Sequence, residues 1–345
     1  MVRLGWLSVA GRARRAFALV AGFALAAPAG AGHAADTITL YNAQHPQVVE
    51  MLTKMFTDET GIAVRVRSGE PPEIANQIAE EGNHSPADVF FTANSPELVL
   101  LGEKGLLAKL AQATLAAIPA KYSASDGSWI GVLAREDVLA FNTSMIEEGA
   151  LPASLMDLAK PAWKGRVAIA PSDADFLPLV SAVAALKGEP AAVDWLKGLK
   201  DNAQVFDDNE GVMAAVDRGA VATGIVNNYY WARLRAENGA GNMHSQIHHF
   251  AGGDVGALVN VSGAAVLKSS AHKETAERFL AFLVSRPAQE ALAKSEIAYE
   301  YPLAAGVAPN PLLKPLATLQ PPPLAAAALG DDQLAARLLR QAGLI

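Results

Sequence analysis

The sequence contains no cysteine, and this limits both how the chain is stabilised and which chemistry it can perform. Without disulfides, the 345 residues must be held by hydrophobic cores, and a hydrophobic content of 51% is enough for two lobes of ordinary size. The lack of thiols also excludes thiolate metal sites and cysteine nucleophiles. A metal ion would have to be held by oxygen and nitrogen donors, which favours hard ions.

The sequence also lacks the short motifs of common hydrolases and nucleotide-binding enzymes. It contains no Gly-x-Ser-x-Gly elbow, no His-Glu-x-x-His helix and no glycine-rich phosphate loop. A secreted enzyme is an alternative from another functional class, but no motif supports it. We therefore predict that the protein is not an enzyme.

Positive charge is scarce, and part of it lies in a predicted export signal at residues 1–35. An alanine-rich apolar run at 16–31 follows the arginines, and small residues at 32–34 predict cleavage after Ala34 or Ala35. The run is too short to anchor the mature chain, so we expect a protein that does not span the membrane. Removing the signal lowers the formal charge from −7 to about −11, which argues against nucleic acid or anionic lipid as a partner. The arginines of the signal are Arg3, Arg12, Arg14 and Arg15.

Two runs of alternating strand and helix patterns predict an α/β fold with parallel strands. Two longer extended stretches, at 129–142 and 256–267, are suited to crossing between two lobes. We predict an N-terminal lobe of residues 36–137 plus 261–310 and a C-terminal lobe of 138–260 plus 311–345, with a cleft between them. The predicted strands are 37–42, 62–67 and 87–92 in the first run, and 166–170, 204–206 and 221–226 in the second.

Candidate ligand-binding side chains follow two of these strands, where parallel sheets bind ligands. His45 lies just past the first strand, and Tyr229 and Tyr230 follow the strand at 221–226, after two asparagines that start a helix. At a helix start both phenols can lean into one cleft. A phenol with a pKa of about 10 ionises at neutral pH only beside a strong cation, such as a metal ion. The alternative is a buried aromatic pair, with His45 exposed and idle.

Three further histidines have no such support. His248 and His249 are adjacent in a strand-like run, so their rings should point to opposite faces and chelate poorly. His244 is similarly isolated. We expect all three at the surface.

Five segments of the sequence resemble bacterial periplasmic ferric-binding proteins, the substrate-binding subunits of ferric iron ABC importers. The resemblance covers essentially the whole mature chain in order, and the NNYYW block is its most specific part. It implies a two-lobed type II periplasmic binding protein fold with discontinuous lobes joined by extended hinge crossings. The segments are YNAQH at 41–45, SPADVF at 85–90, IVNNYYW at 225–231, SGAAVLK at 262–268 and EYPL at 300–303, where we expect a turn.

This resemblance implies that the cleft holds a ferric ion through His45, Tyr229 and Tyr230. Ferric iron is a hard trivalent ion whose charge lowers phenol pKa values enough to form phenolates. The implied function is capture of iron in the periplasm and delivery to the inner-membrane permease of an ABC importer, by a protein that we expect to be a monomer.

The sequence departs from the family's pattern at two places. The family's iron-binding glutamate would fall at Ala93, which has no donor side chain, and its site for a synergistic anion (phosphate, carbonate or citrate) falls at Asp173 and Asp175. Two carboxylates would repel such an anion, so we predict that Asp175, or failing that Asp173, replaces it; the alternative is that they only cap a helix. Asn209 and Asn228 match positions that assist anion binding, and they too could be caps. The same departures motivate a rival ligand, a small organic cation.

Overall fold

Three parallel strands form one end of a mixed sheet. The computed structural model describes residues 37–345, so the predicted export signal lies outside the described residues. β1 (Thr37–Ala43) pairs in parallel with both β2 (Ala63–Ser68) and β3 (Val89–Thr92). The helices α1 (Pro46–Thr60) and α2 (Pro71–Glu81) connect them, which confirms the first predicted alternation.

Local sequence signals explain where these helices begin and end. In α1, proline occupies the first turn, and Val48, Val49, Leu52 and Phe56 form one buried face. The helix ends at Gly61, whose φ of 72° lies in the left-handed region that glycine adopts at low cost.

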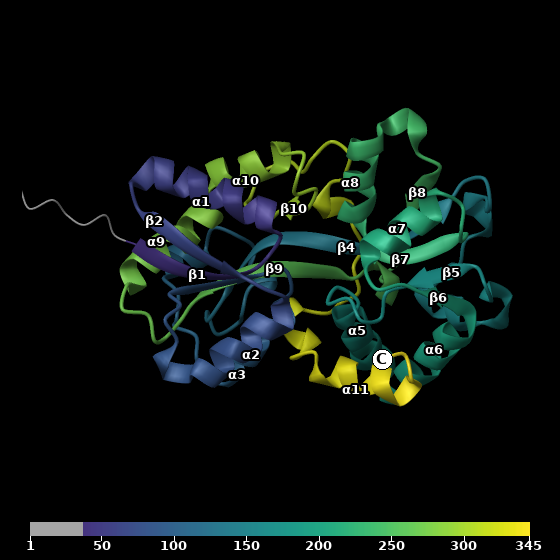
Figure 1. Ribbon diagram of the computed structural model, residues 1–345, viewed down its shortest axis with the longest axis horizontal. Coiled ribbons are helices and arrows are strands. Elements are labelled where there is room, and N and C mark those ends of the chain that lie inside the picture. The colour runs from purple at the N-terminus through teal and green to yellow at the C-terminus, as the bar shows by residue number, and fades with distance from the viewer. Residues whose placement is uncertain (1–36) are drawn as a thin grey trace, which may run out of the picture. The chain divides into compact units, whose positions relative to one another are not determined.

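Two long antiparallel strands carry the sheet from this end to the other. β9 (Val259–Val266) pairs with β3, and β4 (Ile130–Asn142) pairs with β9 as far as Glu136. From Asp137 onward, β4 pairs instead with β7 (Thr223–Asn227). Figure 1 shows β4 and β9 passing through the middle of the described chain. Both predicted crossings are therefore present, and the strand order is β2-β1-β3-β9-β4-β7-β5-β6.

The second end of the sheet is parallel again. β5 (Val167–Ile169) pairs in parallel with β6 (Ala203–Val205) and with β7. β8 (Ser245–His248) is antiparallel to β4. At 300–303 we expected a turn, but Tyr301 and Pro302 form the short strand β10 (Tyr301–Pro302) against β4. Because β10 lies off the main path of the sheet, the missing N–H of proline is tolerated there.

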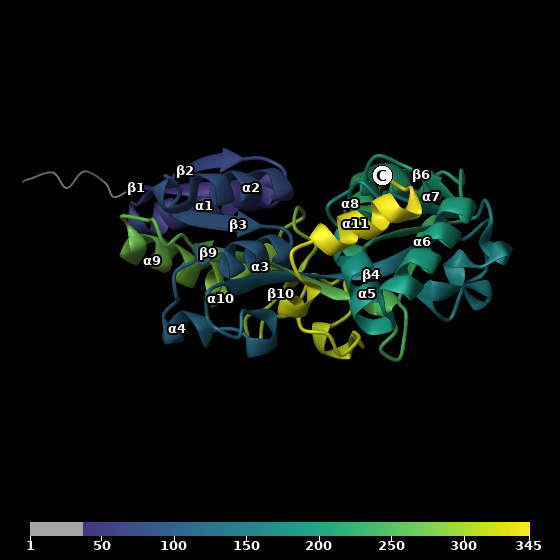
Figure 2. The same cartoon turned by 90° about the horizontal axis from the view of Figure 1, so that it is seen from below.

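Helices cover both faces of the sheet, and buried side chains form two clusters. One cluster contains Phe56, Phe90 and Trp129 and extends across β4 to Tyr229, while the other surrounds Trp195. Figure 2 shows α11 alongside α5 and α6, over the second cluster. The remaining helices are α3 (Ser95–Glu103), α4 (Gln112–Leu115), α5 (Leu177–Lys187), α6 (Glu189–Asn202), α7 (Asn209–Asp217), α8 (Asn228–Asn238), α9 (Lys273–Leu283), α10 (Arg286–Lys294) and α11 (Gln333–Ala342).

Within residues 37–345, no helix combines the length and the apolar character that a membrane crossing requires. The limits that we gave to the two lobes remain a prediction.

Candidate functional site

The two adjacent tyrosines lie in the first turn of α8, directly beyond the carboxyl end of β7. β7 is buried along its whole length, which fixes where α8 begins. Tyr229 is 0% exposed and Tyr230 is 6% exposed, and their ring centroids are 4.1 Å apart. Both rings therefore lean into the same interior space, as the sequence predicts.

Asp175 is the common partner of both phenols. Its Oδ2 accepts hydrogen bonds from the hydroxyl of Tyr229 at 2.6 Å and from that of Tyr230 at 3.1 Å. Asp175 lies in the loop between β5 and α5, so the tyrosines and the carboxylate come from neighbouring strand ends of the same parallel unit. Three oxygen atoms thus converge on one point.

The other oxygen of Asp175 is held by residues at the centre of the sheet. Oδ1 accepts from the guanidinium of Arg135 at 3.1 Å and from Nδ2 of Asn94 at 3.2 Å. Arg135 lies on β4 and is 1% exposed. Its guanidinium also donates to the carbonyl of Ala93 and the side chain of Asn94, and it lies 3.9 Å from a carboxylate oxygen of Glu300. The charge of Asp175 is therefore balanced by a buried cation.

His45 reaches the same cluster from the other end of the sheet. It follows β1, caps α1 and is half-buried. Its ring centroid lies 5.0 Å from that of Tyr229, with an edge-to-face geometry. Because His45 and Asn94 follow β1 and β3 while the tyrosines follow β7, the two ends of the sheet are in direct contact in this closed arrangement.

The electrostatic environment sets which groups are charged when no metal is bound. Burial, reinforced by the negative charge of Asp175, raises the pKa of Tyr229 and Tyr230 well above 10, so both phenols are neutral. Burial opposes ionisation of Asp175 as well, but the charge of Arg135 and the hydrogen bond from Tyr229 hold its pKa below its ordinary value. Burial lowers the pKa of His45 to about 4, so the imidazole is a neutral donor.

The carboxylate of Asp173 has different hydrogen-bond partners from that of Asp175. Its Oδ1 accepts from the backbone N–H of Asp175 and its Oδ2 from that of Asn209, both at 2.9 Å. Burial, together with the charge of Asp175, raises the pKa of Asp173 to about 7. Asp173 does not cap α5, whose N-cap position is Phe176; it holds the Asp175 loop against the start of α7.

The side chain of Asn228 also holds the backbone in place. Asn228 is fully buried, and its side chain accepts from the N–H of Glu136 at 2.8 Å and donates to the carbonyl of Tyr299 at 3.2 Å. It ties the start of α8 to β4. Asn209 begins α7 and borders, together with Asp175, a cavity of only about 10 Å³.

One expectation for the other histidines is wrong. His244 is exposed and His248 is half-buried, but the Nδ1 of His249 lies 2.7 Å from a carboxylate oxygen of Glu136. Glu136 is 1% exposed, and a buried carboxylate is costly without a partner, which explains why His249 turns inward.

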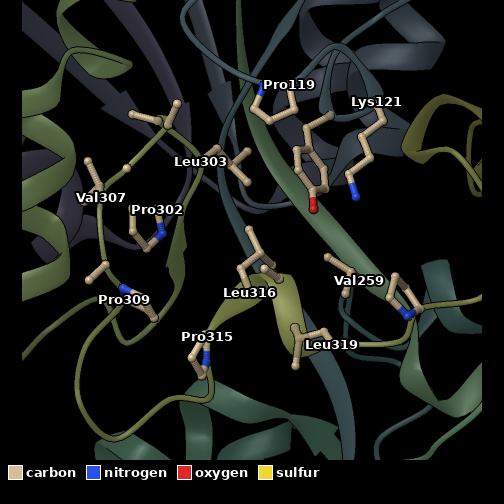
Figure 3. A pocket seen from close by; sticks show the side chains of 17 residues that line it. Pro119, Lys121, Val259, Pro302, Leu303, Val307, Pro309, Pro315, Leu316 and Leu319 are labelled. Carbon is tan, nitrogen blue, oxygen red and sulfur yellow. The ribbon is translucent and has the colours of Figure 1, made fainter.

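The cluster around the two tyrosines is distinct from the cavity shown in Figure 3. Figure 3 shows a cavity of about 580 Å³ lined by Pro119, Leu303 and Leu316, among others, and no side chain of the cluster lines it. Among residues 37–345, no group of three or more His, Cys, Asp or Glu side chains is arranged to hold a metal ion.

Comparison with known proteins identifies the family. A family model described as bacterial extracellular solute-binding protein matches residues 84–321. The chain belongs to this family. A relative at 41% identity over 327 residues is the Fe(3+)-binding periplasmic protein of Serratia marcescens, with 95% of this chain and 96% of that protein covered.

Solved structures of solute-binding proteins with the same fold carry bound iron. Iron-bound HitA from Pseudomonas aeruginosa is 46% identical, with a TM-score of 0.85 over 89% of this chain and 99% of that one. A Trichodesmium protein (IdiA, FutA) in complex with iron and citrate is 30% identical, with a TM-score of 0.78 and the same coverage of 89% and 99%. The predicted two-lobed type II fold and the resemblance to ferric-binding proteins are confirmed, and the solute-binding family is one of transport proteins, not enzymes.

Sequence reasoning missed two residues of the site in this solute-binding protein, Arg135 and Asn94. The signal for Arg135 was present, because Arg135, Glu136 and Asp137 interrupt an otherwise apolar strand. A charged residue inside a buried strand needs a counter-charge, and that need points to a site.

Proposed function

We propose that this solute-binding protein captures ferric iron with His45, Tyr229, Tyr230 and Asp175, and that it does so in the periplasm. It then delivers the ion to the inner-membrane permease of an ABC importer. The observation that carries the proposal is the convergence of two buried phenols on one carboxylate, with a neutral imidazole beside them. The Fe(3+) named for the relative in Serratia marcescens and the iron bound to HitA from Pseudomonas aeruginosa support the same ligand.

The charges of these donors match a trivalent cation. When Fe³⁺ binds, each phenol loses its proton to solvent, and two phenolates together with Asp175 carry three negative charges. His45 adds a neutral nitrogen donor. Phenolate, carboxylate and imidazole are donors that suit a hard ferric ion.

The spacing of the oxygens also suits a small octahedral ion. The two hydroxyl oxygens lie 2.6 Å and 3.1 Å from Oδ2 of Asp175. A small hard ion with metal–oxygen bonds of about 2.0 Å places neighbouring donors about 2.8 Å apart. Iron can therefore replace the two phenol protons with little movement of the donor atoms.

We further propose that Asp175 takes the place of a synergistic anion, so that phosphate, carbonate or citrate is not required. Its carboxylate already pairs with the guanidinium of Arg135, which would otherwise attract such an anion. Asp173 is less suited, because both of its oxygens accept backbone hydrogen bonds. Water completes the coordination sphere. A small organic cation is not favoured as the ligand, because the relative from Serratia marcescens is named for Fe(3+) and HitA from Pseudomonas aeruginosa is iron-bound.

The test is the visible spectrum of the purified metal-free protein during titration with ferric citrate. Phenolate-to-iron charge transfer should colour the parent protein and a Tyr122→Phe control, whose tyrosine lies in the cavity of Figure 3. The double variant Tyr229→Phe, Tyr230→Phe should stay colourless. A colourless parent, or a coloured double variant, would refute the proposed site.

A further inference from the structure

Helix α8 presents a second functional face, on the side opposite the tyrosines. Residues four apart share a helix face, and residues two apart lie on opposite sides. Arg233 accordingly stacks 5.2 Å from the ring centroid of Tyr229, and Arg235 stacks 5.2 Å from that of Trp231. The Trp231 and Arg235 face borders a cavity of about 420 Å³ that is closed by β8 and by residues 312–314.

The side chains with a permanent charge around this cavity are all basic. Arg235, Lys314 and His249 line it, and no acidic side chain among the described residues does so. This is unusual in a chain that has 35 acidic and 28 basic residues. Because Nδ1 of His249 faces Glu136, the ring nitrogen that it can offer to a ligand is Nε2. The cavity is therefore suited to an anion.

The lining also includes apolar side chains, and one of them is held in place. Trp231, Ile247 and Leu312 contribute hydrophobic surface. The indole Nε1 of Trp231 donates to the carbonyl of Ser245 at 3.1 Å, and this bond holds the ring as a flat wall. An inorganic ion could not use this surface, whereas a molecule with a short carbon chain could.

The cavity in Figure 3 provides an internal comparison. It is larger, about 580 Å³, but Lys121 is the single charged residue that lines it within the described chain. Two permanent cations are thus a property of the α8 cavity that the larger cavity does not share.

We propose that the α8 cavity binds a small organic dicarboxylate. One carboxylate pairs with Arg235 and the other with Lys314, while the carbon chain lies on Trp231. The residues involved do not include any proposed iron donor, so this inference stands or falls separately from the proposed function.

The experiment is calorimetric titration of the metal-free protein with succinate and glutarate, and with butyrate and inorganic phosphate as comparison ligands. We expect a dicarboxylate to bind at least about tenfold more tightly than butyrate, which has one charge, or than phosphate, which has no carbon chain. The variants Arg235→Gln and Lys314→Gln should each weaken binding about tenfold or more. Lys121→Gln is the matched control and should bind as the parent does.

Tryptophan fluorescence locates the ligand. Binding should change the emission of the parent, and Trp231→Phe should remove that change. Iron titration of Arg235→Gln should match the parent. The proposal is overturned if no dicarboxylate binds at millimolar concentration, if phosphate binds as tightly as succinate, or if Arg235→Gln and Lys314→Gln both bind as the parent does.

Discussion

Replacing Asp175 with asparagine tests the centre of the site most directly. The substitution keeps the size of the side chain but removes the charge that balances Arg135 and accepts both phenol hydrogen bonds. The nearest remaining anion to Arg135 is Glu300, at 3.9 Å, and burial raises the pKa of Glu300 to about 7. A buried guanidinium would therefore be left poorly compensated.

The expected loss of stability follows from this geometry. Removing one partner of a buried ion pair costs about 3–5 kcal/mol, and the lower end applies because the asparagine oxygen still accepts a hydrogen bond. We expect the metal-free Asp175→Asn protein to lose about 3 kcal/mol of unfolding free energy. For a chain of this size, the melting temperature should fall by about 5 °C.

The same variant should alter iron binding in a distinctive way. Without Asp175, two phenolates supply only two negative charges, so a third must come from solution. In phosphate-free, carbonate-depleted buffer we expect the parent to bind iron and Asp175→Asn to bind it only after phosphate or bicarbonate is added. Asp173→Asn is the matched control, because Asp173 bonds only backbone amides, and it should bind iron without added anion.

Two results would contradict this reasoning. If Asp175→Asn has the same melting temperature as the parent, the ion pair between Arg135 and Asp175 does not stabilise the fold. If the parent itself requires an added anion, Asp175 does not take the anion's place.

Three further predictions concern the phenols and His45. In urea denaturation of the metal-free protein, Tyr229→Phe should lower the free energy of unfolding by about 1.5–3 kcal/mol, and Tyr230→Phe should lower it by less. The reason is that Tyr229 donates the shorter hydrogen bond to the charged acceptor. Equal losses in the two variants would contradict this ranking. Iron binding near neutral pH should release about two protons per ion, since both phenols start neutral. Acid should therefore promote the release of iron. A pH-indicator titration that shows one proton per ion would mean that a single tyrosine ionises. Folding lowers the pKa of His45 from about 6.5 to about 4, so the unfolded protein takes up the proton more readily. The folded protein therefore has its full stability with respect to His45 above pH 6.5 and loses stability as the pH falls toward 4. The parent should therefore lose more stability than His45→Gln over this range, by at most about 3 kcal/mol, and parallel curves would refute the effect.

Some of the structure followed from patterns that are local in the sequence. The short apolar runs separated by helical stripes predicted β1, β2, β3 and the second parallel unit. The run at 221–226, two asparagines and a helical pattern predicted that both tyrosines lie at a helix start. Strand ends, caps and helix starts depend on neighbouring residues, so a single sequence is sufficient to locate them. By contrast, we made no prediction for α3 (Ser95–Glu103), and β10 was expected as a turn.

The sequence by itself determined that two phenols and an imidazole follow the ends of parallel strands, and that two carboxylates lie close by in the chain. It left open which carboxylate meets the phenols. Only the tertiary structure decided this: backbone amides of its own loop and of α7 use both oxygens of Asp173, so Asp175 turns to the tyrosines. It also paired Arg135 with Asp175, and Glu136 with His249, across 40 and 113 residues. The stability of a buried charge depends on the groups that surround it after folding, and no local pattern encodes partners at such distances.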